Sequence, residues 1–188
     1  MMRLKTLLTL IFCTGLACPC FGQKENPNEK LEYLIGTWKL ELEHRKMKIV
    51  ALMEFEWGEN QTFVLSRNRN SRNGGPMETE NTAMISWDGV AQTFVISSVY
   101  NGPGDLLVGR GTVEVTKQKI FRDILLHYAE GEKIPFIDEV AGKGGGKLRY
   151  RQHWEKIDAD SFRGKMEVLM HGEWKTTFDN EIWKSRSN

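Results

Sequence analysis

From Trp38 onward, apolar and polar side chains alternate with a period of two, and this alternation restricts the possible folds more than any other feature. In the run 38–43, Trp-Lys-Leu-Glu-Leu-Glu, every second residue is apolar and the others are charged. Successive side chains of a β-strand point to opposite faces, so the run is typical of a strand with one buried face. Comparable strand-like runs follow at 47–57, 62–69, 81–87, 93–100, 106–115, 120–128, 148–157, 162–171 and 176–184. The pattern predicts an all-β protein of about ten strands.

Turn signals such as Asp88-Gly89 separate most of these runs, which indicates hairpin connections. No strong helical pattern lies between the runs, whereas a parallel sheet would need crossover helices there. We therefore expect antiparallel strands arranged as an up-and-down barrel or a sandwich. The stretch 130–147 fits this pattern least well, and we interpret it either as a flap near a barrel mouth or as a plain exposed loop.

One short helix is expected before the first strand. Asn26 is a suitable N-cap, and Pro27 suits the first helical position because its missing N–H would have no partner there. Leu31 and Leu34 recur at helical spacing, and Gly36 is a good stop signal. The sequence therefore predicts a short N-terminal segment and helix over 23–35.

Residues 1–22 are typical of a cleaved secretory signal peptide. Arg3 and Lys5 give a positive start, an apolar stretch follows, and small residues precede a possible cut before Gln23. The apolar stretch is shorter than the ~20 residues of a membrane span. A lipoprotein signal ending at Cys18 is a less suitable alternative, because the residues before Cys18 fit that motif poorly. We expect a secreted or periplasmic protein with no membrane span.

Removal of residues 1–22 changes which chemistry the chain can carry. All three cysteines lie in this segment, so the mature chain would have no thiol nucleophile, zinc–thiolate site or disulfide. It would also be close to neutral, which gives no support for nucleic-acid binding. The 188-residue chain has room for one domain of ordinary size, expected over 36–186.

Two arginines stand on apolar strand faces. Arg110 shares a face with Leu106 and Val108, and Arg122 alternates with isoleucines. A buried arginine is costly unless it is paired or faces a wet cavity, so both residues indicate an anionic ligand group such as a carboxylate. The alternative is that these arginines lie on the outer face beside exposed neighbours. The other candidate ligand-binding residues are Tyr150, Gln152, Trp154 and Asn180.

Signals for catalysis are weaker. The four histidines show no metal-ligand spacing, so we expect no metal and no cofactor. Most carboxylates stand at outward positions, with Asp123 and Glu181 as the exceptions that could face inward. Two alternatives to ligand binding follow: a cavity hydrolase or isomerase that uses Asp123 or His127, and a structural or protein-interaction barrel with a filled core.

Four short motifs together resemble a known family. They are Leu-Ile-Gly-Thr-Trp at 34–38, Ile-Ser-Trp-Asp-Gly at 85–89, the stretch from Asp158 to Phe162, and Trp-Lys-Ser-Arg at 183–186. Over about 31–186 the chain resembles the secreted bacterial lipocalin-like (calycin) barrels catalogued as domain of unknown function 1579. The resemblance implies a closed antiparallel up-and-down barrel rather than a sandwich.

The same resemblance suggests roles for particular residues. It implies that Trp38 packs across the closed end of the barrel, beneath a cation from Lys184 or Arg186. Haem, which nitrobindin-like barrels hold through a histidine near the last strand, is not expected, because 176–186 contains no histidine. The resemblance also implies that the barrel interior binds a small, mostly apolar or amphipathic molecule, such as a lipid or a fatty acid.

Overall fold

The computed structural model describes residues 26–44, 46–101, 106–128, 130 and 146–185. The expected signal peptide, Arg186 and nearly all of the stretch 130–147 lie outside these residues. The side chains of His44, Leu106 and Asn180 also lie outside the described part, although their backbones belong to strands.

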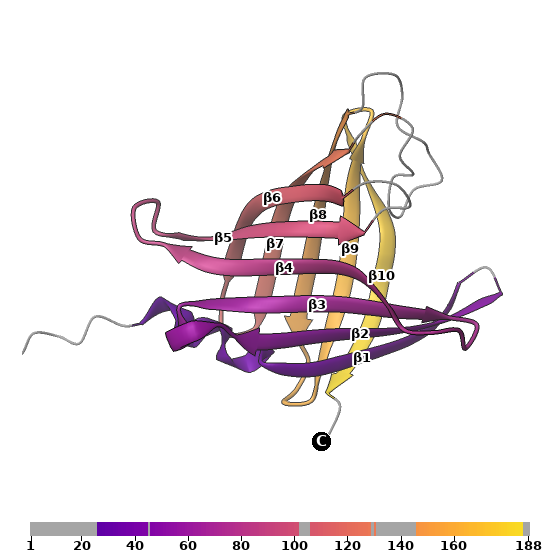
Figure 1. Cartoon of the computed structure of the whole chain (residues 1–188), viewed down its shortest axis with the longest axis horizontal. Coiled ribbons are helices and arrows are strands. Elements are labelled where there is room, and N and C mark those ends of the chain that lie inside the picture. The colour runs from indigo at the N-terminus through magenta and orange to yellow at the C-terminus, as the bar shows by residue number, and fades with distance from the viewer. Residues whose placement is uncertain (1–25, 45, 102–105, 129, 131–145, 186–188) are drawn as a thin grey trace, which may run out of the picture.

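Ten antiparallel strands form a closed barrel (Figure 1). Each strand pairs with the next along the chain, and β1 pairs with β10 to close the ring. The strands are β1 (Gly36–His44), β2 (Met47–Trp57), β3 (Phe63–Arg72), β4 (Glu78–Asp88), β5 (Thr93–Asn101), β6 (Leu106–Val115), β7 (Lys119–Tyr128), β8 (Gly146–Lys156), β9 (Ser161–Met170) and β10 (Glu173–Ser185). The predicted all-β, up-and-down barrel is confirmed, and the architecture is consistent with a lipocalin-like barrel.

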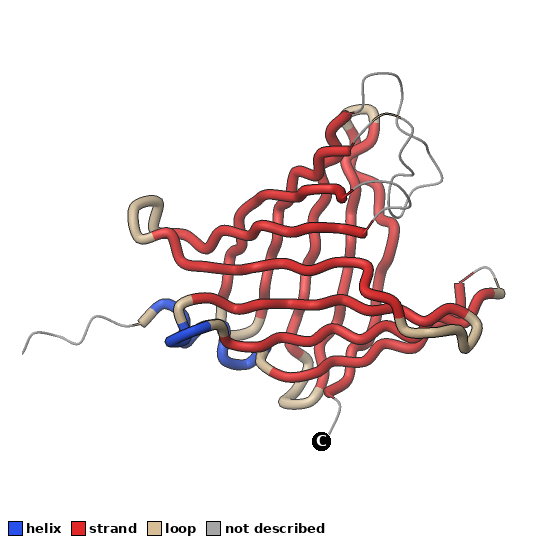
Figure 2. Tube along the Cα trace, viewed as in Figure 1, coloured by secondary structure: helices blue, strands red, loops and turns tan. Residues whose placement is uncertain are grey.

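The predicted helix exists, but it is a 3-10 helix, η1 (Pro27–Leu34), rather than an α-helix. The side chain of Asn26 accepts a hydrogen bond from the backbone N–H of Asn28 at 3.1 Å, so Asn26 is the N-cap. The side-chain amide of Asn28 donates to the carbonyl of Gln61 at 2.9 Å, which joins η1 to the short 3-10 turn η2 (Glu59–Gln61). Figure 2 shows these two helical segments beside the same end of the barrel.

An aromatic layer fills the barrel end next to η1. The ring of Phe162 lies 4.9 Å from that of Trp38, 5.4 Å from that of Trp154 and 5.9 Å from that of Trp183, centroid to centroid. The Trp38 indole N–H donates to the carbonyl of Leu34 at 2.8 Å, which ties this layer to η1. Side chains of 150–250 Å² each bury much apolar surface here, so this end is closed.

The expected cation over Trp38 is not Lys184. Trp183 points into the aromatic layer, so its neighbour Lys184 points out and is exposed. Phe162 occupies the ring contact instead, and no cation of the described chain lies over the Trp38 ring. The prediction for Lys184 is therefore wrong, because alternation places it on the outer face.

The contact between β1 and β10 is much shorter than the others. Trp38 pairs with Ser185 and Lys39 with Lys184, and the pairing goes no further. On its other edge β1 pairs with β2 from Gly36 to His44. In β10 the register also shifts on both sides of Phe178. The ring is therefore closed tightly beside η1, while β1 and β10 separate toward the opposite end.

Candidate functional site

On the side of the aromatic layer that faces away from η1, the barrel holds a cavity of about 180 Å³. One wall, from β1 and β2, is apolar and consists of Leu40, Leu42, Ile49, Ala51 and Met53. The adjoining wall, from β3 to β5, carries the polar side chains of Ser66, Asn68, Asn70, Asn81 and Ser98. A cavity with one apolar and one polar wall is suited to an amphipathic molecule.

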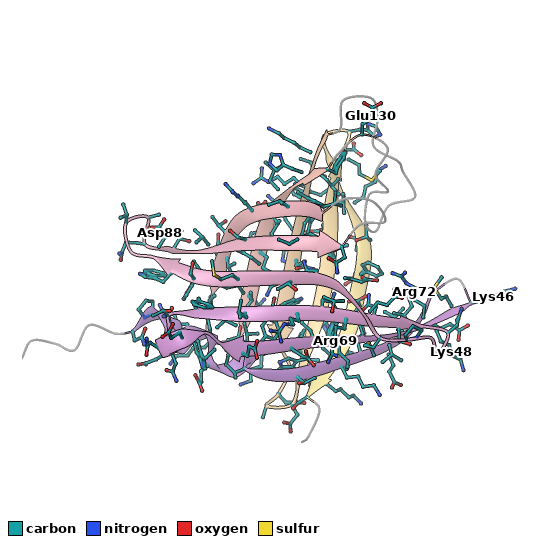
Figure 3. The ribbon with its side chains drawn as sticks, viewed as in Figure 1. Lys46, Lys48, Arg69, Arg72, Asp88 and Glu130 are labelled. Atoms are coloured by element: carbon teal, nitrogen blue, oxygen red, sulfur yellow. The ribbon has the colours of Figure 1, made fainter. Side chains whose placement is uncertain are left out.

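Charged residues mark the mouth of the cavity. Arg72 and Glu80 both line it, and their side chains form an ion pair with each other. Figure 3 shows Arg72 at the end of the barrel opposite Asp88, near Lys46 and Lys48. Because η1 and the aromatic layer close the other end, the cavity opens toward Arg72.

Arg122 is the most unusual residue of the interior. It lies on β7 between two inward isoleucines and is only 5% exposed. Its guanidinium carbon lies 4.0 Å from the ring centre of Trp154 and 5.8 Å from that of Phe55. Its Nε and Nη2 atoms are buried, and no described residue provides a hydrogen-bond partner for them. Burial lowers the pKa of Arg122 to about 10, so the group still carries its charge at neutral pH.

A pair of tyrosines lies on the same side of the cavity as Arg122. The hydroxyls of Tyr100 and Tyr150 are hydrogen-bonded to each other, with their ring centres 6.4 Å apart. Burial raises the pKa of both phenols, and the nearby charge of Arg122 lowers it to a smaller extent. Both phenols are therefore neutral at pH 7, and Arg122 has no phenolate as a counter-ion.

Glu181 is a second acidic residue that lines the cavity, in addition to Glu80. It lines the cavity from β10, and burial raises its pKa to about 7, while the Trp183 indole N–H acts in the opposite direction. Gly164, opposite Glu181 on β9, leaves room for both side chains. A Cβ atom at Gly164 would lie 3.2 Å from Trp183 Nε1 and 3.6 Å from Glu181 Oε2.

Three of the sequence-predicted site residues lie where the alternation predicts. Arg122, Gln152 and Trp154 face inward and line the cavity. Tyr150 also faces inward and is buried behind Tyr100. Asn180 belongs to β10, but its side chain lies outside the described residues.

The prediction for Arg110 is wrong. Arg110 is exposed on the outer face of β6, where Val108 is also 40% exposed. The inward face of β6 carries Gly109 and Gly111 beside Leu107 and Val113. Glycine has no side chain that would mark a position as buried. The outward-facing Val108 therefore made the outer face of β6 look like the apolar one.

Asp123 and His127 also lie outside the cavity. The carboxylate of Asp123 accepts two hydrogen bonds from Arg149, both at 2.7 Å, on the outer face of β7. The Arg149 hydrogen bonds hold the pKa of Asp123 below its usual range. His127 is exposed on the same face. The expectation that either residue acts inside the cavity is therefore wrong.

The polar wall was missed by sequence reasoning. In β3, the inward residues Ser66, Asn68 and Asn70 alternate with Arg67 and Arg69, so no position in the run is apolar. Period-two analysis has no signal when both faces are polar. The one available hint was that the short polar residues alternate strictly with arginines.

Comparisons with known proteins add no family. No protein-family model matches the chain, and no curated protein was found to match it. Within the described ranges, no group of three or more His, Cys, Asp or Glu side chains could hold a metal ion. No helix of the described chain is long and apolar enough to cross a membrane.

Proposed function

We propose that this protein binds a small amphipathic anion, a carboxylate with a short apolar tail, inside its barrel. The observation that carries the proposal is Arg122, a buried cation that lines the cavity and has no counter-ion among the described residues. A buried charge is costly unless it is paired, and a bound carboxylate would supply both the opposite charge and the missing acceptors. The neutral hydroxyls of Tyr100 and Tyr150 lie close enough to Arg122 for its charge to lower their pKa values.

The size and walls of the cavity limit the ligand. About 180 Å³ is less than the ~300–1,000 Å³ of a site for a drug-sized molecule, so we propose a short fatty-acid-like chain. Its tail would lie on the apolar wall formed by β1 and β2, including Leu40 and Met53. Removal of this tail from water would stabilise the complex by about 25 cal/mol per Å².

Calorimetric titration of the protein with hexanoate and with hexan-1-ol tests this proposal. Hexanoate should bind more tightly than hexan-1-ol, and Arg122→Met should remove the difference. Arg110→Met is the matched control, because it deletes an arginine from the outer face and should leave hexanoate binding unchanged. Equal binding of both probes to the unsubstituted protein, or full binding by Arg122→Met, would contradict the proposal.

We further propose that the protein is exported after removal of residues 1–22. The positive start and apolar stretch support this, and the resemblance to secreted lipocalin-like barrels agrees with it. The intact mass of the exported chain tests the proposal, since it should correspond to a chain that begins at Gln23. A lipid-modified chain beginning at Cys18 would instead support the lipoprotein alternative.

A further inference from the structure

The charged side chains around the cavity differ in whether they have partners. Arg72 and Glu80 pair with each other, and Lys165 donates to the carboxylate of Glu167 at 2.7 Å. The two remaining charged groups that line the cavity are Arg122 and Glu181. Neither forms an ion pair with any group in the described part of the chain. The cavity is thus lined by one buried arginine and one half-buried glutamate, neither of which forms an ion pair within the described residues.

These two groups are associated with one row of paired residues that crosses three strands. Trp154 on β8, Gly164 on β9 and Glu181 on β10 are paired in one row across the sheet. The guanidinium of Arg122 lies over the Trp154 ring at one end of this row, and Glu181 stands at the other end. The backbones of β8 and β10 are two strand spacings apart, roughly 10 Å. Gly164, between them, has no side chain, and the Glu181 carboxylate and the Trp183 indole nitrogen lie in the space above it.

The surroundings of Glu181 suit a cation. Glu181 Oε2 and the indole of Trp183 lie together above Gly164, and both residues line the cavity. A carboxylate attracts an ammonium group by charge and accepts hydrogen bonds from it. No ammonium or guanidinium group of the described chain is close enough to Glu181 to form an ion pair.

We infer that the cavity is built for a zwitterion, whose carboxylate binds Arg122 and whose ammonium group, several bonds away, binds Glu181 beside Trp183. This inference rests on the proposed binding of an anion at Arg122 and adds a second, cationic end to the ligand. A linear amino acid with its two charges at opposite ends has this chemistry.

The test compares 6-aminohexanoate with hexanoate, two probes of equal chain length that differ in the ammonium group. Calorimetric titration of the unsubstituted protein should show that 6-aminohexanoate binds about tenfold more tightly, the effect of one additional ion pair. Glu181→Gln should reduce this ratio to about one. Glu114→Gln, the same carboxylate-to-amide change at an exposed position on the outer face of β6, should leave the ratio unchanged and serves as the control.

Failure of this inference can be distinguished from failure of the proposed function. If hexanoate binds and depends on Arg122, but 6-aminohexanoate binds no more tightly, the zwitterion inference is overturned and anion binding stands. A tenfold preference that survives in Glu181→Gln would also overturn it. If hexanoate does not bind at all, the proposed function fails. The comparison of the two probes on the unsubstituted protein needs no variant to fold.

Discussion

Replacing Arg122 with methionine should stabilise the protein while it removes ligand binding. Arg122 is 5% exposed, and burial lowers its pKa from 12.5 to about 10. At 1.36 kcal/mol for each pKa unit, keeping this group charged at pH 7 costs about 3 kcal/mol. The stacking of the guanidinium on Trp154 at 4.0 Å returns about 1–2 kcal/mol.

The net effect of Arg122→Met is therefore a gain of about 1–2 kcal/mol in the free energy of unfolding. Methionine is unbranched and apolar, so it can occupy the same space against Trp154 and Phe55 without a charge. For a protein of this length the midpoint of thermal unfolding should rise by about 2–4 °C for each kcal/mol gained. A residue that lowers stability at neutral pH is better explained by binding than by folding.

Urea unfolding at pH 7, followed by tryptophan fluorescence, measures this effect through the transition midpoint and slope. Ile124→Met is the control, because Ile124 lies on the same strand and inward face and is 1% exposed. This volume-conserving exchange should destabilise the protein by less than about 1.5 kcal/mol. If Arg122→Met lowers the stability by more than Ile124→Met does, Arg122 has a structural partner and the reasoning about an unpaired charge is refuted.

Three further predictions concern stability. Glu181 has a pKa near 4.5 when unfolded and about 7 when folded, so the stability contributed by its neutral form is present below pH 4.5 and is lost as the pH rises through 7. Glu181→Gln should therefore become more stable than the unsubstituted protein between pH 4.5 and 8, by about 3 kcal/mol at most. Urea unfolding at a series of pH values measures this difference, and the same dependence of stability on pH in both proteins would contradict the prediction. Glu167 should behave oppositely, because hydrogen bonding to Lys165 lowers its pKa, and the stability that Glu167 contributes is lost as the pH falls through its folded pKa. Glu167→Gln should therefore flatten the acid side of the plot of stability in urea against pH. An unaltered acid side would argue against a stabilising pair between Glu167 and Lys165. Gly111→Ala should destabilise the barrel by about 1–3 kcal/mol, because a Cβ atom there would lie 1.9 Å from the carbonyl oxygen of Asp123, and an unchanged thermal midpoint would show that β7 moves freely away.

Local pattern was sufficient for several features of this protein. Period-two alternation predicted the strands, because the alternation of apolar and polar side chains can be recognised within one run without knowing which strands pair with it. The N-cap at Asn26 placed the helix, although all of η1 is a 3-10 helix, whose residues Leu34 and Glu32 accept hydrogen bonds from Trp38 and Trp57. The inward direction of Arg122 also followed from its isoleucine neighbours.

Other features depended on which strands meet. Gly109 and Gly111 carry no side chain, so only the assembled sheet shows that their face of β6 points inward. The row of Trp154, Gly164 and Glu181 joins three strands by their register, and register across a sheet is set by the fit of whole strands rather than by any local run. The sequence alone thus determined that the chain forms strands with one apolar face. Closure of the barrel decided that a cation and an anion share its interior, because burial in a common cavity exists only after the last strand meets the first.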